Sequence, residues 1–377
     1  MLTLLAAAAL ARPLVMAHYM PWYESKPTGG HWGWHWTMNH FHPDKGQIAS
    51  RYSPIIGPYD SSDPEALEYE TLEMKVSGID GVFIDWYGTK DLYDYPLINR
   101  NTQKMIEACT KARLKFAIVL EDQVVPNLVK NGKSTPEEFG RSVSKWLETR
   151  WFQRRDYLRW QNKPVLLIFG PQYYKTTDLR RFFGSTALFT LLGRKEPAVG
   201  GYGWPEPQVG DSRSWTQVRA FYERAKQWPA SIPVAYPRFE DIYKAAGIGS
   251  GYGKIRDAGG ATFDRTLSMA IRSHAPFIQI ATWNDWGEGT QIEPSKEFGY
   301  RDLERLQAQR RKLDPSFPYR RTDLRVPERI YRLRKRHASP SKLDQARRAL
   351  MLGQGSRAER ILASLVRGLN APDRSRR

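Results

Sequence analysis

Residues 78–87 read GIDGVFIDWY, and this stretch shows the pattern that decides the fold. Its core, 81–87, is short, rich in β-branched and aromatic residues, and almost continuously apolar, as expected of a strand buried on both faces. Similar apolar runs occur at 14–22, 115–120, 164–169, 187–192, 199–204, 232–236 and 277–283. The sequence therefore predicts eight buried strands.

Amphipathic, helix-like stretches separate these runs, at 64–77, 101–112, 136–147, 215–227 and 264–274. Thr135-Pro136-Glu137-Glu138 supplies the cap, the proline and the acids typical of a helix start. Alternation of strands and helices with eight strands predicts an α/β protein of the (β/α)8 TIM-barrel class. An open doubly wound sheet is the alternative, because counting strands does not show closure.

The chain has 377 residues, more than the roughly 250 that one such barrel needs. We expect a barrel domain over 12–313, a basic linker over 314–337 and a basic helical hairpin and tail over 338–377. The net charge is +18, and residues 301–377 alone hold 22 Lys and Arg against 8 Asp and Glu. This appendage is expected either to contact an anionic polymer or membrane surface, or to be a solvated face.

Residues 1–11, MLTLLAAAALA, form an apolar run that ends like a signal-peptide cleavage site. They predict a secreted or periplasmic protein. Because the run lacks a basic start, a cytoplasmic location is the alternative. No later stretch reaches the roughly 18 apolar residues of a membrane span. Cys109 is the single cysteine, so no intrachain disulfide forms.

Active sites of (β/α)8 barrels form at the C-terminal ends of the strands. The predicted strands end in aromatic, carboxylate and a few other polar residues, namely Tyr19, Trp22, Tyr23, Asp85, Trp86, Tyr87, Glu121, Trp204, Arg238, Asn284, Asp285 and Glu288. Sugar rings stack on Trp and Tyr, while carboxylates bind hydroxyls and cleave glycosidic bonds. The strand ends therefore predict a carbohydrate-binding cleft.

Asp285 and Glu288 are the predicted catalytic pair, three residues apart in a glycine-containing turn. One carboxyl would protonate the leaving oxygen, and the other would act as nucleophile or base. The structural alternative is that one of them only caps the turn. For Asp85 and Glu121 the alternative to substrate contact is a buried hydrogen-bonded bracket, and for the tryptophans it is core packing.

His31 and His35 have a spacing that could ligate zinc on a helix, but the interleaved tryptophans favour a loop. We therefore expect His31 to bind a sugar hydroxyl and predict no metal. The sequence holds no Walker A motif, no dinucleotide fingerprint and no Gly-x-Ser-x-Gly motif, so we predict no organic cofactor, and we predict no nucleic-acid partner.

Four blocks in the same order along the chain resemble glycoside hydrolase family 99 and its relatives. They are AHYMPWY at 17–23 with HWG at 31–33, GPYDSSDP at 57–64, GIDGVFIDWYG at 78–88 and TWNDWGEGTQIEP at 282–294. The last block is the most specific, because it resembles the Asn-Glu-Trp-x-Glu-Gly-Thr-x-Ile-Glu signature of that family. The resemblance covers roughly residues 14–300.

The resemblance implies a (β/α)8 barrel and endo-acting, retaining cleavage of α-mannosides through a 1,2-anhydro sugar. It would make Asp285 the base for the sugar 2-hydroxyl and Glu288 the acid. Glu121, Trp86 and Tyr87 would line the reactive subsite. Asp285 stands where the family has Glu, which is also compatible with a family-71-like α-glucanase or with a different sugar.

We therefore predict a glycoside hydrolase that cleaves an α-linked glycan of the mannan or glucan type. Two alternatives belong to other classes. One is a glycosyltransferase of polysaccharide biosynthesis, which would act only on an activated sugar donor. The other is a non-catalytic carbohydrate-binding barrel, which the departure at Asp285 would permit.

Overall fold

The computed structural model describes residues 12–370, and its central feature is a barrel of parallel strands. The barrel strands are β1 (Leu14–Tyr19), β2 (Gly81–Trp86), β3 (Lys115–Leu120), β5 (Lys163–Ile168), β6 (Ala187–Leu191), β7 (Gly200–Tyr202), β8 (Val234–Ala235) and β11 (Phe277–Ile280). Their hydrogen-bonded order is β7-β6-β5-β3-β2-β1-β11-β8. Each falls within a predicted apolar run or within one residue of it, which confirms the strand assignment.

A single bridge closes this sheet into a barrel. Ile232, two residues before β8, pairs in parallel with Tyr202 of β7. Its N–H donates to the carbonyl of Gly201 at 3.0 Å, and its carbonyl accepts from the N–H of Gly203 at 2.9 Å. The predicted (β/α)8 barrel is therefore confirmed over the open-sheet alternative.

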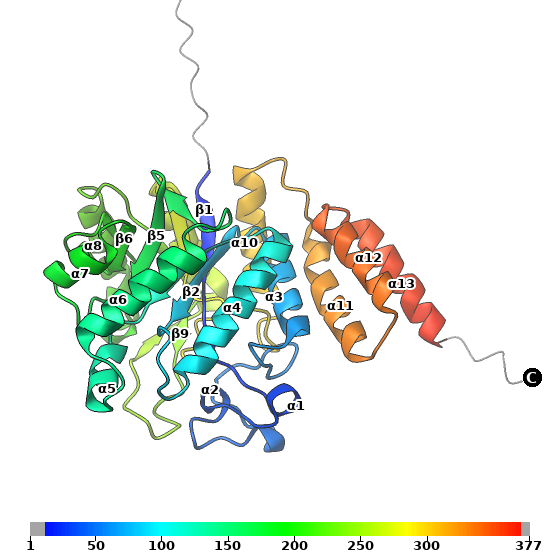
Figure 1. Cartoon of the computed structure of the whole chain (residues 1–377). Helices are drawn as coiled ribbons and strands as arrows, with labels where there is room; N and C mark the ends of the chain where they lie inside the picture. Colours follow the sequence, from blue (N-terminus) through cyan, green and yellow to red (C-terminus); the bar gives the residue numbers. More distant parts are fainter. Residues whose placement is uncertain (1–11, 371–377) are drawn as a thin grey trace, which may run out of the picture.

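Helices surround the barrel (Figure 1). They are α3 (Pro64–Ser77), α4 (Tyr95–Ala112), α5 (Val124–Lys130), α6 (Pro136–Trp146), α7 (Thr176–Phe183), α8 (Asp211–Ala225), α9 (Ala261–Arg272) and α10 (Arg301–Leu313), with α1 (Lys26–Gly29) and α2 (Trp34–Thr37) in the loop after β1. Short pairings add β4 (Arg159–Trp160) to β5, and join β9 (Phe239–Glu240) to β10 (Lys254–Ile255).

Local sequence signals set several helix ends. Before α3, the Asp63 carboxylate accepts the N–H of Glu65 at 2.9 Å, and Gly78 ends the helix at a φ of 96°. Thr135 caps α6 in the same way, through the N–H of Glu138 at 3.1 Å. Helix α4 begins at Tyr95, six residues before the predicted start, because a proline at its first turn is compatible with a helix N-terminus.

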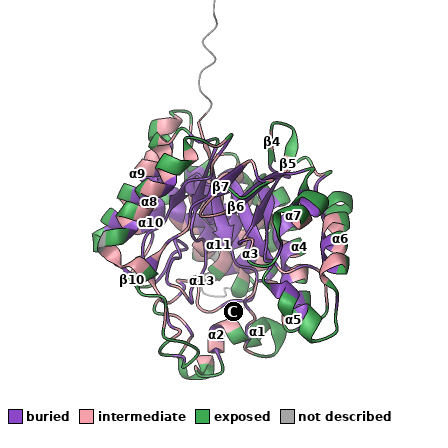
Figure 2. Ribbon diagram, turned by 90° about the vertical axis from the view of Figure 1, so that its left-hand side faces the viewer, coloured by how far each residue is buried: buried purple, intermediate pink, exposed green. Residues whose placement is uncertain are grey.

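The strands form the buried centre of the molecule, and most of the surrounding helices leave an outer face exposed (Figure 2). Helix α3 differs, with ten of its 14 residues buried. All six residues of β2 are buried, and so are five of the six in β3. This agrees with the nearly continuous apolar sequence of the strands, because parallel strands in such a barrel are covered on both faces.

The C-terminal region packs against the barrel from one side (Figure 1). Residues 326–335, expected to be linker, form helix α11 (Val326–Lys335), which packs on α3 and buries Val326, Ile330 and Leu333. Helices α12 (Pro340–Met351) and α13 (Gly355–Asn370) follow as an antiparallel hairpin. The apolar spacing of α11 explains why this segment is a packed helix despite its many arginines.

The predicted signal peptide, residues 1–11, lies outside the described residues. Within residues 12–370, no helix combines the length and the apolar character needed to cross a membrane.

Candidate active site

A cavity of about 200 Å³ opens at the C-terminal end of the barrel. Its walls come from segments that follow β1, β2, β8 and β11, and its lining residues are Trp22, Tyr23, Trp34, His35, Met38, Tyr87, Tyr243, Asp285 and Gly287. Aromatic rings and one carboxylate thus meet where barrel enzymes bind their substrates. Four residues of the predicted site, Trp22, Tyr23, Tyr87 and Asp285, line this cavity.

The turn after β11 holds Asp285 and Glu288 in fixed positions. The N–H of Asp285 donates to the Thr282 hydroxyl at 2.8 Å, and its own Oδ1 accepts the N–H of Glu288 at 3.0 Å. Backbone hydrogen bonds from Glu240 to Glu288 and from Ile242 to Gly287, at 2.9 and 3.0 Å, clamp the turn from the β9 side. The turn is therefore rigid at both ends, as a preorganised catalytic pair requires.

Burial dominates the electrostatics of this pair. It raises the pKa of Asp285 to about 7, although the backbone N–H groups of Glu288 and Gly287 act in the opposite direction. Burial also raises the pKa of Glu288 well above its usual range, and the negative charges of Asp285 and Asp241 raise it further. Within the described residues, Oε2 of Glu288 is buried without a hydrogen-bond partner. A carboxyl in this state keeps its proton near neutral pH, as a proton donor must.

Two further acids follow neighbouring strands, Asp85 at the end of β2 and Glu121 after β3. Both are buried. Burial raises the pKa of Asp85, and the charge of Asp285 raises it further. Burial raises the pKa of Glu121, and the charge of Asp85 raises it further. The Oε2 atom of Glu121 accepts a 2.7 Å hydrogen bond from the Gln123 side chain. Three strand ends thus bring carboxyl groups within electrostatic reach of one another.

Hydrogen bonds of Asn284, Tyr19 and the lining residue Tyr23 hold the segments around the cavity together. The Asn284 side chain forms two hydrogen bonds with the backbone of Met20, at 2.8 and 3.0 Å. The Tyr23 hydroxyl donates to the carbonyl of Asn284 at 2.9 Å and accepts the N–H of Trp286 at 3.1 Å. Tyr19 is fully buried and donates to Glu70 at 2.9 Å. These contacts tie the β1 loop to the β11 turn.

Besides Tyr19, three predicted aromatic residues lie outside the cavity lining. Trp86 donates to Asn99 of α4 at 3.1 Å and packs on Trp151, on the helix side of β2. Trp204 packs on His18 and Phe169, with ring centroids 4.8 and 5.0 Å away. His31 is exposed, and its Nε2 lies 3.4 Å from Glu24.

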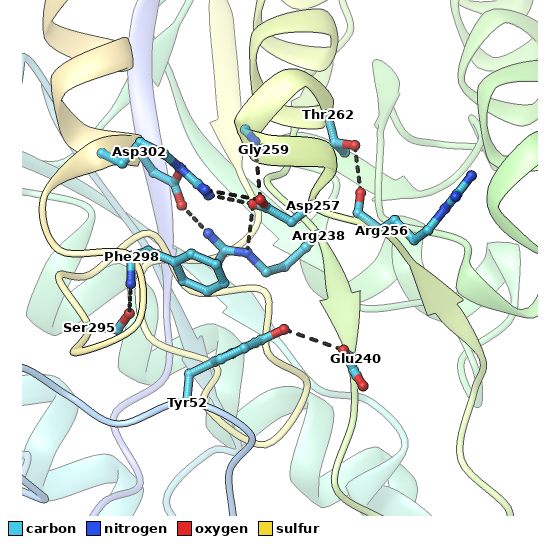
Figure 3. Close-up of polar contacts among 12 residues, drawn as sticks. Tyr52, Arg238, Glu240, Arg256, Asp257, Gly259, Thr262, Ser295, Phe298 and Asp302 are labelled. Carbon is cyan, nitrogen blue, oxygen red and sulfur yellow. Dashed lines mark hydrogen bonds and ion pairs between the residues drawn. The ribbon is translucent and has the colours of Figure 1, made fainter.

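Arg238 is held by protein groups (Figure 3). It is 1% exposed, pairs with Asp257 and Asp302, donates to the carbonyl of Gln291 at 2.8 Å and lies over the ring of Phe298. Its donors are therefore occupied within the fold. The geometry indicates that Arg238 anchors the segment before β9 to α10, and through β9 it supports the Glu288 turn.

The sequence interpretation did not include His35, Trp34, Met38 or Tyr243 in the site. His35 stacks on Trp22 with ring centroids 4.3 Å apart and an interplanar angle of 5°. It lies in α2, within the loop after β1, where the neighbouring tryptophans of the sequence gave a partial signal. Tyr243 lies in the loop after β8, where no motif marked it.

Within residues 12–370, no group of three or more His, Cys, Asp and Glu side chains is arranged to hold a metal ion.

No protein-family model matches the chain. Among curated proteins, it is similar to the glycoprotein endo-alpha-1,2-mannosidase-like protein of Danio rerio, with 22% identity over 282 residues that cover 67% of this chain. It is also similar to the glycoprotein endo-alpha-1,2-mannosidase of Mus musculus, with 21% identity over 320 residues and 74% coverage of this chain. The matched parts span 61% and 67% of those two proteins.

Among solved structures, the chain is similar to the GH99 endo-alpha-mannosidase of Bacteroides thetaiotaomicron. The TM-score is 0.61 at 19% identity, covering 80% of this chain and 97% of that one. A glycoside hydrolase-like protein gives a TM-score of 0.55 at 12% identity, covering 79% and 94%. These likenesses show the fold. Together with the motif order and the similarity to the two curated proteins, they support the resemblance that the sequence indicates, which is to the barrel proteins of glycoside hydrolase family 99 and its relatives.

Proposed function

We propose that this protein is a glycoside hydrolase that cleaves an α-linked glycan at the cavity above β11. The observation that carries the proposal is the pair Asp285 and Glu288 in one hydrogen-bonded turn. Asp285 is buried and lines the cavity, Glu288 is half-buried with a buried Oε2 atom, and the pKa values of both carboxyls are raised. Glycosidic hydrolysis commonly needs two such groups, one to donate a proton and one to accept a proton or attack the sugar.

In the proposed reaction, Glu288 protonates the oxygen of the leaving sugar as the glycosidic bond breaks. Asp285 acts as the base or the nucleophile. In the version that the family resemblance implies, Asp285 removes the proton of the 2-hydroxyl, and that oxygen attacks the anomeric carbon to give a 1,2-anhydro sugar. Water then opens this intermediate at the anomeric carbon. Glu288 removes a proton from the water, and Asp285 returns the proton it holds to the 2-oxygen, so that both groups are restored.

An α-mannoside is the first substrate class to test, because the relatives named above are endo-mannosidases. An α-glucan is the second, because Asp285 replaces the Glu of the family signature. The aromatic lining, with Trp22, Trp34 and Tyr87, supports a polymeric or oligomeric sugar over a small charged metabolite.

The deciding experiment compares the wild-type chain with Glu288→Gln on a panel of α-mannans and α-glucans. We expect cleavage products from the wild type, and at least a 10²-fold loss of turnover with retained glycan binding in the variant, at about the magnitude of lost acid catalysis. Glu107→Gln, an exposed change on α4 outside the cavity lining, serves as the matched control and should keep full activity.

Other results would assign the site differently. Full turnover in Glu288→Gln would overturn the role of Glu288. Glycan binding without any product in the wild type would favour a carbohydrate-binding barrel. Product formed only from an activated sugar donor would favour a transferase.

Export from the cytoplasm is a separate proposal, supported by the apolar run at 1–11. Mass spectrometry of the N-terminus of the chain recovered from periplasm or medium would test it. Recovery of the uncleaved chain in the cytoplasm alone would contradict it.

A further inference from the structure

The C-terminal helices carry most of the positive charge of the protein. Residues 301–377 hold a net +14 of the total +18. Residues 326–370, which span helices α11–α13, hold 11 Lys and Arg against 3 Asp and Glu, and these charges are divided between two faces of the α11–α13 unit. One face meets the barrel, and the other is open to solvent.

The barrel-facing cations are neutralised by acids of the barrel. Arg334 pairs with Glu68 at 2.6 Å, and Arg347 approaches the same carboxylate at 3.4 Å. Lys335 pairs with Asp63 at 2.7 Å, just before α3. These pairs, together with the apolar face of α11, hold the unit against α3. Their charge is used within the fold and is not available to a partner.

The outward-facing cations are arranged differently. Lys342, Arg357 and Arg360 are exposed, and within the described residues no carboxylate oxygen lies within 4.0 Å of their side-chain nitrogens. On α13, Arg357, Arg360, Ser364 and Arg367 recur at spacings of three, four and three residues, so they share one helix face. Lys342 faces them from α12.

These cations surround two adjoining hollows. One, of about 420 Å³, is lined by Lys342, Gln345, Arg357, Arg360, Ile361 and Ser364. The other, of about 330 Å³, adds Arg320 and the turn 353–356 while sharing Arg357 and Arg360. We define the basic groove by its four cations, Arg320, Lys342, Arg357 and Arg360. It is elongated, because the two hollows meet at the arginines.

Two acids lie near the basic groove, and neither cancels its charge. Asp323 lines one of the hollows but is only 5% exposed, and its Oδ2 accepts the backbone N–H of Arg320 at 2.8 Å. Glu359 pairs with Arg329 of α11. With four cations and one buried carboxylate in its lining, the groove keeps a net positive charge, which is complementary to an anionic ligand.

We propose that the basic groove binds an acidic polysaccharide chain, one bearing carboxylate or sulfate groups. Guanidinium groups bind such planar or tetrahedral anions in bidentate geometry. Two hollows that share a pair of arginines fit an extended chain better than the flat surface of a bilayer. This proposal is independent of the reaction at Asp285 and Glu288, because the groove and the cavity share no residue.

The test measures binding of the full chain to polygalacturonate as a function of salt. The variant Lys342→Glu/Arg357→Glu/Arg360→Glu reverses the charge at three of the four cations of the basic groove. The control Lys145→Glu/Arg155→Glu/Lys163→Glu changes the net charge equally, at exposed positions on α6 and around β4 and β5. A second variant, Lys342→Gln/Arg360→Gln, removes charge more gently if the first fails to fold.

We expect the wild type and the control to bind, and the groove variants to lose at least about tenfold in affinity at low salt. Equal loss in the control would overturn the proposal, since it would show a net-charge effect. Binding of the wild type to vesicles with phosphatidylglycerol but not to polygalacturonate would also overturn it, in favour of a membrane surface. Absence of binding to either would overturn it outright. Cleavage assays on neutral α-glycans report separately on the proposed hydrolase.

Discussion

The Oδ1 atom of Asp285 accepts the backbone N–H of Glu288 at 3.0 Å, so one acid of the pair positions the other. An aspartate side chain is short enough to close such a local turn onto the backbone. A glutamate, one methylene longer, would not close the same ring. This contact gives a structural reason for Asp285 at the position where the family signature has Glu. Asp285 thus has two roles that can be tested individually, holding the turn and accepting a proton.

Asp285→Asn separates the turn-forming role from the proton-accepting role. The amide oxygen can still accept the N–H of Glu288, but the side chain can no longer take a proton. We expect kcat to fall by about 10²- to 10⁴-fold while the melting temperature stays close to that of the wild type. Asp285→Ala, which loses both roles, should also lower the melting temperature. If the wild type, Asp285→Asn and Asp285→Ala all cleave at the same high rate, Asp285 is not the base or nucleophile.

The pH dependence of cleavage should follow Asp285. Burial raises the pKa of this carboxyl to about 7, and the base must be ionised to act. Log(kcat/KM) should therefore rise with pH below about 7 and level off above it, until loss of the Glu288 proton lowers activity at higher pH. Initial rates between pH 5 and 9 give the profile. A rate that is constant from pH 5 to 7 in the folded protein would refute the prediction.

Arg238→Met tests whether Arg238 supports the fold or contacts substrate. Removing the guanidinium breaks the ion pairs of Arg238 with Asp257 and Asp302 and leaves the buried Asp302 with Arg301 as its remaining partner. Breaking a buried ion pair commonly costs up to about 3–5 kcal/mol. We expect a clearly lower free energy of unfolding in chemical denaturation. The control Arg256→Met removes an exposed arginine that pairs with Asp211 and should cost less than about 1 kcal/mol. An unchanged stability with a raised KM would instead support a substrate contact.

Glu73→Gln tests a buried acid between α3 and α11. Both carboxyl oxygens of Glu73 lack a hydrogen-bond partner within the described residues. Burial raises the pKa of Glu73, and the negative charge of Glu328 raises it further. A raised folded-state pKa contributes stability that is complete below the unfolded value of about 4.5 and is lost as pH rises towards the folded value. The wild type should therefore lose stability from pH 5 to 8 relative to Glu73→Gln.

We expect the gain of Glu73→Gln at pH 8 to be about 1–3 kcal/mol, measured by denaturant unfolding at both pH values. Glu107→Gln, an exposed change on α4, is the matched control and should be neutral at each pH. A parallel pH dependence in the wild type and Glu73→Gln would count against the buried, protonated state of Glu73.

The sequence by itself determined the strands, the barrel class and the segment that carries the acids. Buried parallel strands need continuous apolar runs, and 81–87 and its seven counterparts could form little else. The ends of these strands then placed Asp85, Glu121 and Asp285 at one rim, because parallel strands share a direction. The starts of helices were also predictable from the sequence where a capping residue was present, as at Asp63 and Thr135.

Only the tertiary structure decided which side chains at that rim face the cavity. Adjacent residues of a strand point to opposite faces, so Asp85 and Trp86 cannot serve the same site, and the sequence carries no mark of the inward one. The structure also gave Arg238 its buried partners, Asp257 and Asp302, which lie far along the chain. Loop residues such as Tyr243 join the site through long-range packing, which no local pattern encodes.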